Sequence, residues 1–135
     1  MKHFLFILSF LFIGVAPILA QDDDNDVDDN ATIRDKMSEY IQQRLNLTSD
    51  EAKKFKPVFI DYFREWKKTA RENRGDNLVL RQKITDLQIR YRARFRDIIG
   101  EPRSNQIFMH QRGFILELRR LRQERLRGGG AKKNP

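Results

Sequence analysis

The sequence LTSDE, at residues 47–51, marks the start of a helix and organises the chain on either side of it. The Thr48 hydroxyl is placed to accept a hydrogen bond from the backbone N–H of Glu51. In return, the Glu51 carboxylate can accept one from the backbone N–H of Thr48. Asp50 and Glu51 also bring negative charge to the first turn, where the helix dipole favours it. The stretch therefore predicts a capping box, with a helix that begins at Ser49.

Aromatic side chains recur at helical spacing after this cap. Within the predicted helix 49–73, the regularly spaced positions are Ala52, Phe55, Phe59, Tyr62, Phe63 and Trp66. They fall on one face of a helix and are predicted to form its core side. Pro57 lies inside this segment and removes one backbone hydrogen bond, so we expect a bend near the first turn.

Three further segments show the same periodicity, so the chain is predicted to be all-α. We expect helices at about 32–45, 77–99 and 103–127, with no strand pattern between them. Their apolar positions are Ile33, Met37, Tyr40, Ile41 and Leu45, then Leu80, Ile84, Leu87, Tyr91, Phe95 and Ile98, and finally Ile107, Phe114, Leu118 and Leu121. The middle set forms a narrow seam, close to a coiled-coil stripe.

Short breaks separate these helices. Asn46 and Leu47 form a turn before the cap, and Asp76 is suited to cap the helix that follows the break at Arg74-Gly75. The sequence GEP at residues 100–102 is expected to end one helix and begin the next. Residues 128–135, which start with three glycines, are predicted to be a flexible tail beyond a helical domain at 32–127.

Residues 1–20, MKHFLFILSFLFIGVAPILA, have the pattern of a secretory signal peptide. An apolar run of 16 residues follows Lys2 and the small residue Ala20 ends it. A spanning helix needs about 20 residues, and Pro17 lies near the end of the run, so cleavage is favoured over an uncleaved membrane anchor. The chain has no cysteine, which excludes lipid attachment and disulfides. We expect the mature chain in the periplasm.

An acidic run follows the predicted signal. Six aspartates lie between residues 22 and 29, and we expect residues 21–31 to form a disordered, solvated arm. Alternating aspartates also suggest a calcium loop. However, Asp29 stands where that loop requires glycine, and Asp35 where it requires glutamate. We interpret the run as a tether and expect neither metal nor cofactor.

The rest of the chain is strongly basic. The only charged side chains before residue 30 are Lys2 and the six aspartates. The remaining sequence therefore has 26 Lys and Arg against 13 Asp and Glu, a net charge of +13. The C-terminal half is rich in arginine rather than lysine. An acidic arm is thus joined to a basic body, a pairing that favours electrostatic contact between the two.

Three stretches of the sequence resemble the Spy/CpxP family of periplasmic proteins. Leu47-Thr48-x-x-Glu51 is similar to the family's LT-x-x-Q motif, with Glu51 in place of glutamine. Residues 52–59 and 99–127 are similar to a branch labelled as sensors of extracytoplasmic-function (ECF) sigma factors. The resemblance implies a bent α-hairpin of about four helices that dimerises antiparallel into a cradle. It also implies an ATP-independent chaperone for unfolded clients or a modulator of envelope-stress sensors.

Two arginine groups are candidates for a client-binding surface, Arg90, Arg92, Arg94 and Arg96 in one segment and Arg119, Arg120 and Arg122 in the next. In the first group, Arg92 and Arg96 share one side of the helix and Arg90 and Arg94 share another. The two pairs flank the seam formed by Tyr91 and Phe95. The functional interpretation is a surface that attracts acidic or unfolded chains. The alternative is a solvated face whose arginine stems cover core edges.

Catalysis has little support in the sequence. His110 is the only histidine after the predicted signal, with no recognisable triad partner and too few ligands for zinc. The charge alone would also suit nucleic acid or an anionic surface, but export and the lack of helix-turn-helix spacing argue against nucleic acid. We therefore expect a non-enzymatic, homodimeric binding protein that acts as a chaperone or as a dedicated regulator of an ECF sigma/anti-sigma system.

Overall fold

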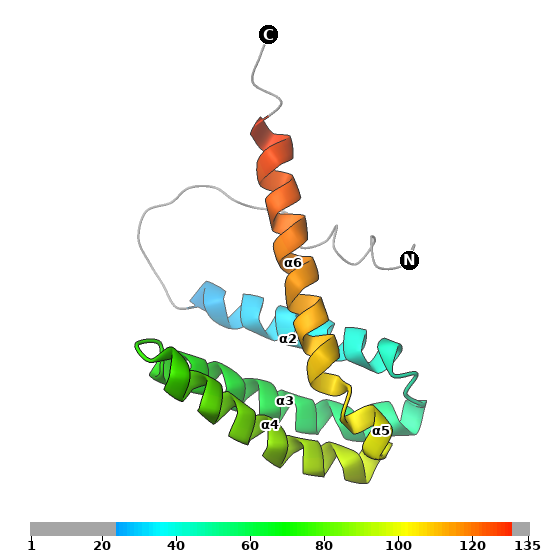
Figure 1. Ribbon diagram of the computed structural model, residues 1–135. Coiled ribbons are helices and arrows are strands. Elements are labelled where there is room, and N and C mark those ends of the chain that lie inside the picture. The colour runs from blue at the N-terminus through cyan, green and yellow to red at the C-terminus, as the bar shows by residue number, and fades with distance from the viewer. Residues whose placement is uncertain (1–23, 131–135) are drawn as a thin grey trace.

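The computed structural model describes residues 24–130, which form five helices and no strand (Figure 1). In chain order they are α2 (Asp24–Arg44), α3 (Ser49–Glu72), α4 (Asn77–Ile99), α5 (Glu101–Ser104) and α6 (Ile107–Gly130). The prediction of an all-α chain is confirmed for this part of the sequence. The predicted signal at residues 1–20 lies outside the described residues, as do residues 131–135 of the predicted tail.

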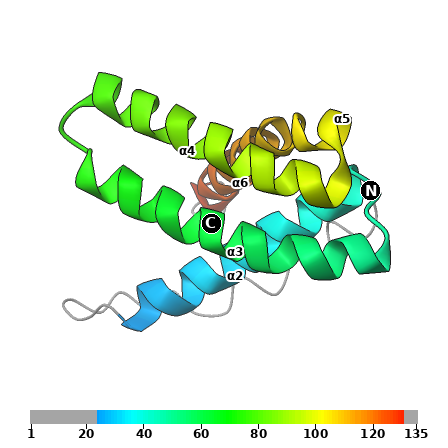
Figure 2. The same cartoon turned by 90° about the horizontal axis from the view of Figure 1, so that it is seen from below.

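Helices α3 and α4 form a long antiparallel hairpin, which is the base of the fold (Figures 1 and 2). Helix α2 lies over α3. The short helix α5 turns the chain at the end of α4, and α6 then crosses α2 and rises steeply away from the hairpin. The second half of α6 consequently stands clear of the other helices.

The turn between α2 and α3 forms where the sequence predicted it. Asn46 takes the left-handed conformation at φ 50°, which asparagine tolerates at the end of a helix. The Leu47 N–H donates to the Gln42 carbonyl at 3.1 Å, closing the last turn of α2. Thr48 is then the N-cap of α3, and its reciprocal bonds with Glu51 confirm the capping box.

Helix α4 has the bounds predicted for it. The Asp76 carboxylate accepts from the N–H groups of Leu78 and Val79, at 3.0 and 3.1 Å. At the other end Gly100 has a φ of +81°, a conformation that favours glycine. Its N–H donates to the Arg96 carbonyl at 2.9 Å. The chain can therefore leave α4 and enter α5 within one residue.

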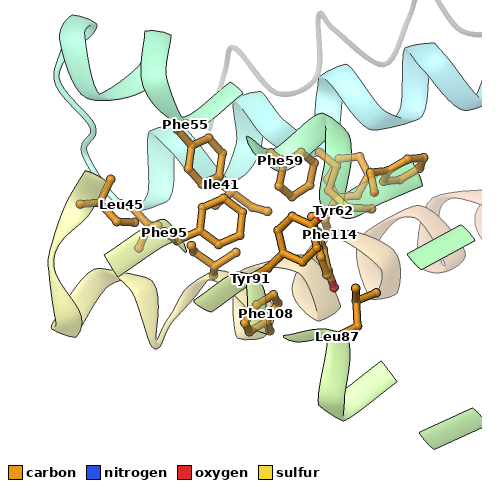
Figure 3. Close-up of a cluster of buried hydrophobic side chains, with 14 residues drawn as sticks. Ile41, Leu45, Phe55, Phe59, Tyr62, Leu87, Tyr91, Phe95, Phe108 and Phe114 are labelled. Atoms are coloured by element: carbon orange, nitrogen blue, oxygen red, sulfur yellow. The ribbon is translucent and has the colours of Figure 1, made fainter. Parts of the chain in front are cut away.

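The core is a cluster of aromatic rings between the two arms of the hairpin, covered by α2 and α6 (Figure 3). Phe55 lies 5.1 Å from Phe95, and Tyr62 lies 5.5 Å from Tyr91, measured between ring centroids. Its buried hydrophobic members are Met37, Ile41, Leu45, Phe55, Phe59, Tyr62, Phe63, Leu87, Tyr91, Phe95, Ile99, Ile107, Phe108 and Phe114. Most were predicted from periodicity, whereas Ile99 and Phe108 were missed, and Ile98 is only partly buried.

The acidic arm predicted to be disordered over 21–31 is helical from Asp24 onward, because α2 begins there. The prediction treated the run of like charge as unable to fold. However, aspartates in the first turn of a helix lie at the positive end of the helix dipole, where negative charge is favourable, and the prediction did not take this into account. The aspartates from Asp24 to Asp29 therefore extend α2 instead of preceding it.

The predicted helix at 103–127 is divided in two. Pro102 lies in the first turn of α5, and the buried Ser104 hydroxyl donates back to the Glu101 carbonyl at 2.9 Å. The chain then turns at 105–106 before α6 begins.

At its other end α6 continues through Gly128–Gly130, which were predicted to end it, since extending an existing helix adds one hydrogen bond per residue. Helix α3 likewise runs through Pro57 without interruption.

Candidate functional site

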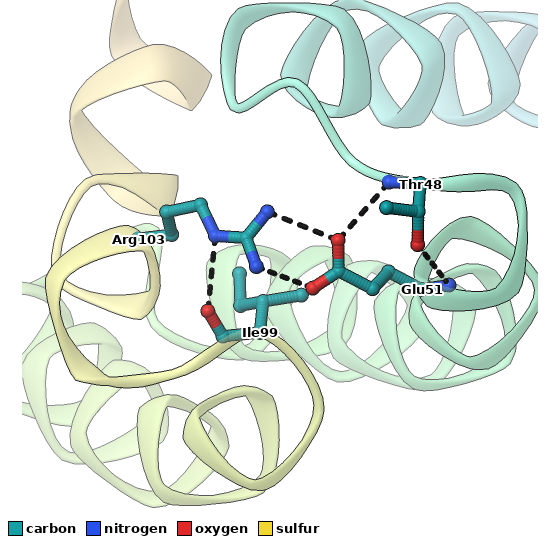
Figure 4. Close-up of polar contacts among 4 residues, drawn as sticks. All are labelled: Thr48, Glu51, Ile99 and Arg103. Carbon is teal, nitrogen blue, oxygen red and sulfur yellow. Dashed lines mark hydrogen bonds and ion pairs between the residues drawn. The ribbon is translucent and has the colours of Figure 1, made fainter.

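The capping box is joined to a distant part of the chain by Arg103 (Figure 4). One carboxylate oxygen of Glu51 accepts from the Thr48 N–H at 3.0 Å and from Arg103 Nη1 at 3.0 Å. The other oxygen accepts from Arg103 Nη2. Arg103 Nε also donates to the carbonyl of Ile99 at 3.0 Å. Glu51 thus ties the start of α3 to the α4–α5 turn.

These bonds act on the ionisation of Glu51. The Arg103 guanidinium, followed by the Thr48 backbone N–H, lowers the pKa of the Glu51 carboxyl from 4.5 to about 2. The carboxylate is consequently charged at any physiological pH. The arrangement has a structural role, since both oxygens are already occupied by groups of this chain.

A second polar contact lies inside the core and was not predicted. The Tyr62 hydroxyl donates to Gln111 Oε1 at 2.6 Å and accepts from Gln88 Nε2 at 3.4 Å, joining α3, α6 and α4. Burial raises the pKa of Tyr62 to about 12. The sequence contained one sign of this network, because Gln111 interrupts the apolar stripe of α6. Among the described residues no buried side-chain polar atom lacks a partner.

The four candidate arginines of α4 divide into two pairs. Arg90 binds Glu65 of α3 at 2.6 Å, and Arg94 lies 3.8 Å from Asp61 of α3. Both guanidinium groups also stack on the ring of Tyr91, at 5.5 and 5.0 Å from its centroid. This pair holds the two arms of the hairpin together, a role that neither interpretation of the arginines predicted.

Tyr91 contributes to the same contact. Its hydroxyl donates to Glu65 Oε1 at 2.5 Å, and this bond, followed by Arg90, lowers the pKa of the Glu65 carboxyl. Burial and the neighbouring carboxylate raise the pKa of Tyr91 to about 12. The Glu65 carboxylate is therefore occupied on both oxygens, by Tyr91 and by Arg90.

Arg92 and Arg96 lie on the other side of α4, exposed to solvent. Neither makes an ion pair or side-chain hydrogen bond within the part of the chain that the structure describes. Ile89 shares this face and is 52% exposed. An apolar side chain beside two unpaired cations is the composition that suits binding of a polypeptide with acidic and apolar groups.

The arginines of α6 form a separate group. Arg120 is engaged by Glu117 and Glu124 of its own helix, at 2.5 and 2.6 Å. Arg119 and Arg122 are exposed, with no such contact among the described residues. The second half of α6 stands away from the hairpin that contains α4 (Figure 1).

Exposed hydrophobic side chains follow the same two helices. The large ones within 24–130 are Leu78, Ile89, Met109, Leu116 and Leu126, and all five belong to α4 or α6. Helix α3, and α2 from Asn30 onward, expose none of them. The helices that carry the candidate arginines are therefore also the ones that present apolar surface.

The described residues contain no cluster of acidic, histidine or cysteine side chains that could hold a metal ion. His110 is half-buried, and burial together with Arg44 lowers its pKa. No helix within the described residues has the length and apolar character needed to cross a bilayer.

Comparison of the chain with protein-family models finds no match, and neither does comparison with curated proteins or with solved structures.

Proposed function

We propose that this chain is a periplasmic binding protein that holds unfolded or stress-related polypeptides on its basic, partly apolar helical surface without using ATP. The observation that carries the proposal is the coincidence of exposed hydrophobic and unpaired basic side chains on α4 and α6. Arginines attract a chain by long-range charge, and apolar side chains hold it at short range.

The face of α4 around Ile89 is the best candidate for first contact. Arg92 and Arg96 leave their guanidinium groups available, whereas Arg90 and Arg94 are engaged with α3. A single exposed isoleucine flanked by two cations offers little apolar area, so we expect weak and rapidly exchanging contacts, which suit a protein that releases clients without an energy source.

A client-aggregation assay tests the proposal. Full chain should be expressed with its own signal, purified in processed form and added to several unrelated reduced or heated clients. We expect suppression of aggregation at about 0.1 M salt and its loss at about 1 M, where the screening length falls to about 3 Å. Unchanged aggregation of every client would refute general client holding.

The same assay separates the proposal from its two alternatives. Failure with general clients, joined to tight binding of one anti-sigma partner, would indicate a dedicated regulator of an ECF sigma factor. Salt-dependent binding of duplex DNA without client protection would indicate nucleic-acid binding instead.

A further inference from the structure

Helix α6 carries a straight stripe of apolar and basic side chains on the side opposite the core. Met109 and Leu116 belong to it and are 51% and 63% exposed. Phe114 is buried two residues before Leu116, and two residues turn an α-helix by about 200°. Spacings of three and four residues keep side chains on one side of a helix. At these spacings the stripe, which we call the outer face of α6, contains Met109, Arg112, Leu116, Arg119, Gln123 and Arg127.

The outer face is positive along its whole length. None of its six positions is acidic. Arg112, Arg119 and Arg127 are exposed and make no ion pair or side-chain hydrogen bond among the side chains that the structure describes. Arg127 lies 18 residues after Met109, which corresponds to about 27 Å of helix. The stripe therefore offers cations to an anionic partner over this length.

The carboxylates nearest to the outer face are already neutralised. Glu117 and Glu124 both bind Arg120, at 2.5 and 2.6 Å. Glu117 follows Leu116 directly, so it lies about 100° around the helix from it. Glu124 comes one heptad after Glu117 and lies on the same side. Neither carboxylate belongs to the outer face, where it would repel an anion.

The exposed face of α4 differs in this respect. Ile89 has Arg92 and Arg96 on its side of the helix, but Asp86 lies one turn before Ile89 and is exposed. A carboxylate beside the apolar side chain repels a surface that is uniformly negative. A polypeptide can avoid this repulsion by placing a cation or a hydrogen-bond donor there. Of the two faces, the outer face of α6 is therefore the better match to an anionic surface.

A lipid membrane fits the outer face because it makes no demand on spacing. Lipid phosphates form a continuous and mobile layer, so each guanidinium can bind one, whereas a polypeptide would need acidic groups at matching intervals. Arginine stems lie beside Met109 and Leu116 and can enter the interface with them while the guanidinium groups stay among the phosphates. The second half of α6 stands clear of the other helices, which leaves Arg119 and Arg127 accessible to a flat surface (Figure 1).

We propose that the outer face of α6 binds the surface of an anionic lipid membrane. Met109 and Leu116 enter the headgroup layer, and Arg112, Arg119 and Arg127 bind lipid phosphates. The helix lies along the surface, and the binding is reversible because two apolar side chains provide little insertion. This activity is distinct from client binding at the Ile89 face of α4 and does not depend on it.

Cosedimentation of the processed full chain with lipid vesicles, without any client, tests the proposal. At about 0.1 M salt we expect binding to vesicles that contain phosphatidylglycerol and none to vesicles of phosphatidylcholine alone. At about 1 M salt the chain should be released, because the attraction between exposed charges is screened.

Two triple variants locate the contact. The first replaces the arginines of the outer face and is Arg112→Gln/Arg119→Gln/Arg127→Gln. The second, the matched control, removes equal charge from α4 and is Arg81→Gln/Arg92→Gln/Arg96→Gln. The first should weaken vesicle binding about tenfold or more, and the control should bind as wild type does. Circular dichroism confirms that each variant is folded.

A fluorescent reporter identifies the side chains that enter the lipid. Trp66 is the only tryptophan of the chain. Trp66→Phe keeps an aromatic ring against Phe63, whose centroid lies 5.6 Å from that of Trp66. In this background, Leu116→Trp should give a blue-shifted emission on phosphatidylglycerol vesicles, whereas Ile89→Trp on α4 should not.

Three results would overturn membrane binding by the outer face. They are the absence of binding to phosphatidylglycerol vesicles at about 0.1 M salt, equal weakening by the two triple variants, and an unshifted emission from Leu116→Trp. A chain that ignores vesicles but binds polyglutamate through the outer-face arginines would assign this face to an acidic polypeptide instead. Client aggregation is measured separately, so failure of the proposal on membranes is distinguishable from failure of client binding.

Discussion

Arg103 of α5 holds Glu51 of α3 through two N–H···O contacts, although 52 residues separate them in the sequence. The same carboxylate caps the first turn of α3. The Glu51 side chain therefore caps the start of the aromatic helix α3 and also binds the turn that leads from the hairpin into α6. Residues 47–51 therefore join the start of α3 to the turn at the end of the hairpin.

Loss of the cap should lower stability measurably. Thr48→Ala removes the hydroxyl that accepts from the Glu51 N–H at 3.2 Å. We expect a cost of about 1 kcal/mol and a melting temperature lower by about 4 °C. Ser49→Ala is the matched control, because it removes a neighbouring exposed hydroxyl with no capping bond. Equal melting curves for Thr48→Ala and wild type would show that the cap contributes nothing.

Glu51→Gln separates the charge from the cap. Glutamine still accepts from the Thr48 N–H but gives Arg103 no negative charge. A carboxyl whose pKa is lowered by folding stabilises the native state above its unfolded value of 4.5, and this contribution is lost as pH falls through about 2. Wild type should therefore exceed the variant in denaturant midpoint near pH 7, and the difference should shrink between pH 4.5 and about 2. A difference that does not vary with pH would contradict the ion pair.

The buried bond between Tyr62 and Gln111 predicts strong coupling. Tyr62→Phe leaves the Gln111 carbonyl buried without its donor, which costs about 1–3 kcal/mol. The double variant Tyr62→Phe/Gln111→Leu removes both partners and should recover much of that loss. Urea unfolding of both single variants and the double variant measures the coupling. Additive losses would mean that the two side chains act independently.

Gly113→Ala is expected to stabilise the chain. A Cβ at this position would lie 3.5 Å from the Tyr40 hydroxyl, an ordinary contact. Alanine is favoured over glycine in a helix by about 1 kcal/mol, so the melting temperature should rise by a few degrees. Gly100→Ala is the contrasting control, because a φ of +81° strains any residue with a Cβ. A lower melting temperature for Gly113→Ala would show that α2 and α6 need closer approach than the structure has.

Local chemistry made much of this fold predictable from sequence. The caps at Thr48 and Asp76 each use a side chain within three residues of the groups they satisfy, so α3 and α4 could be placed closely. The aromatic positions of α3 followed from their spacing alone. The start of α2 could not be placed, because composition rules for charged runs and the helix dipole predict opposite outcomes there.

Contacts between distant residues were beyond sequence reasoning. Nothing in the spacing of Glu51 and Arg103, or of Tyr62 and Gln111, shows that each pair meets. The candidate surface was predictable only by helical side, since periodicity separated Arg90 and Arg94 from Arg92 and Arg96. That Glu65 and Asp61 engage the first pair depends on how α3 packs against α4.

The division of the α4 arginines gives a direct test of client binding. Arg92→Gln/Arg96→Gln removes the cations beside Ile89, while Arg90→Gln/Arg94→Gln removes the same charge from the hairpin contact. Both folded variants should be compared with wild type in client aggregation at about 0.1 M salt. We predict that the Arg92/Arg96 variant loses most of its protection, whereas the Arg90/Arg94 variant keeps its protection and melts at a lower temperature. Equal protection by both variants and wild type would contradict client binding at this face.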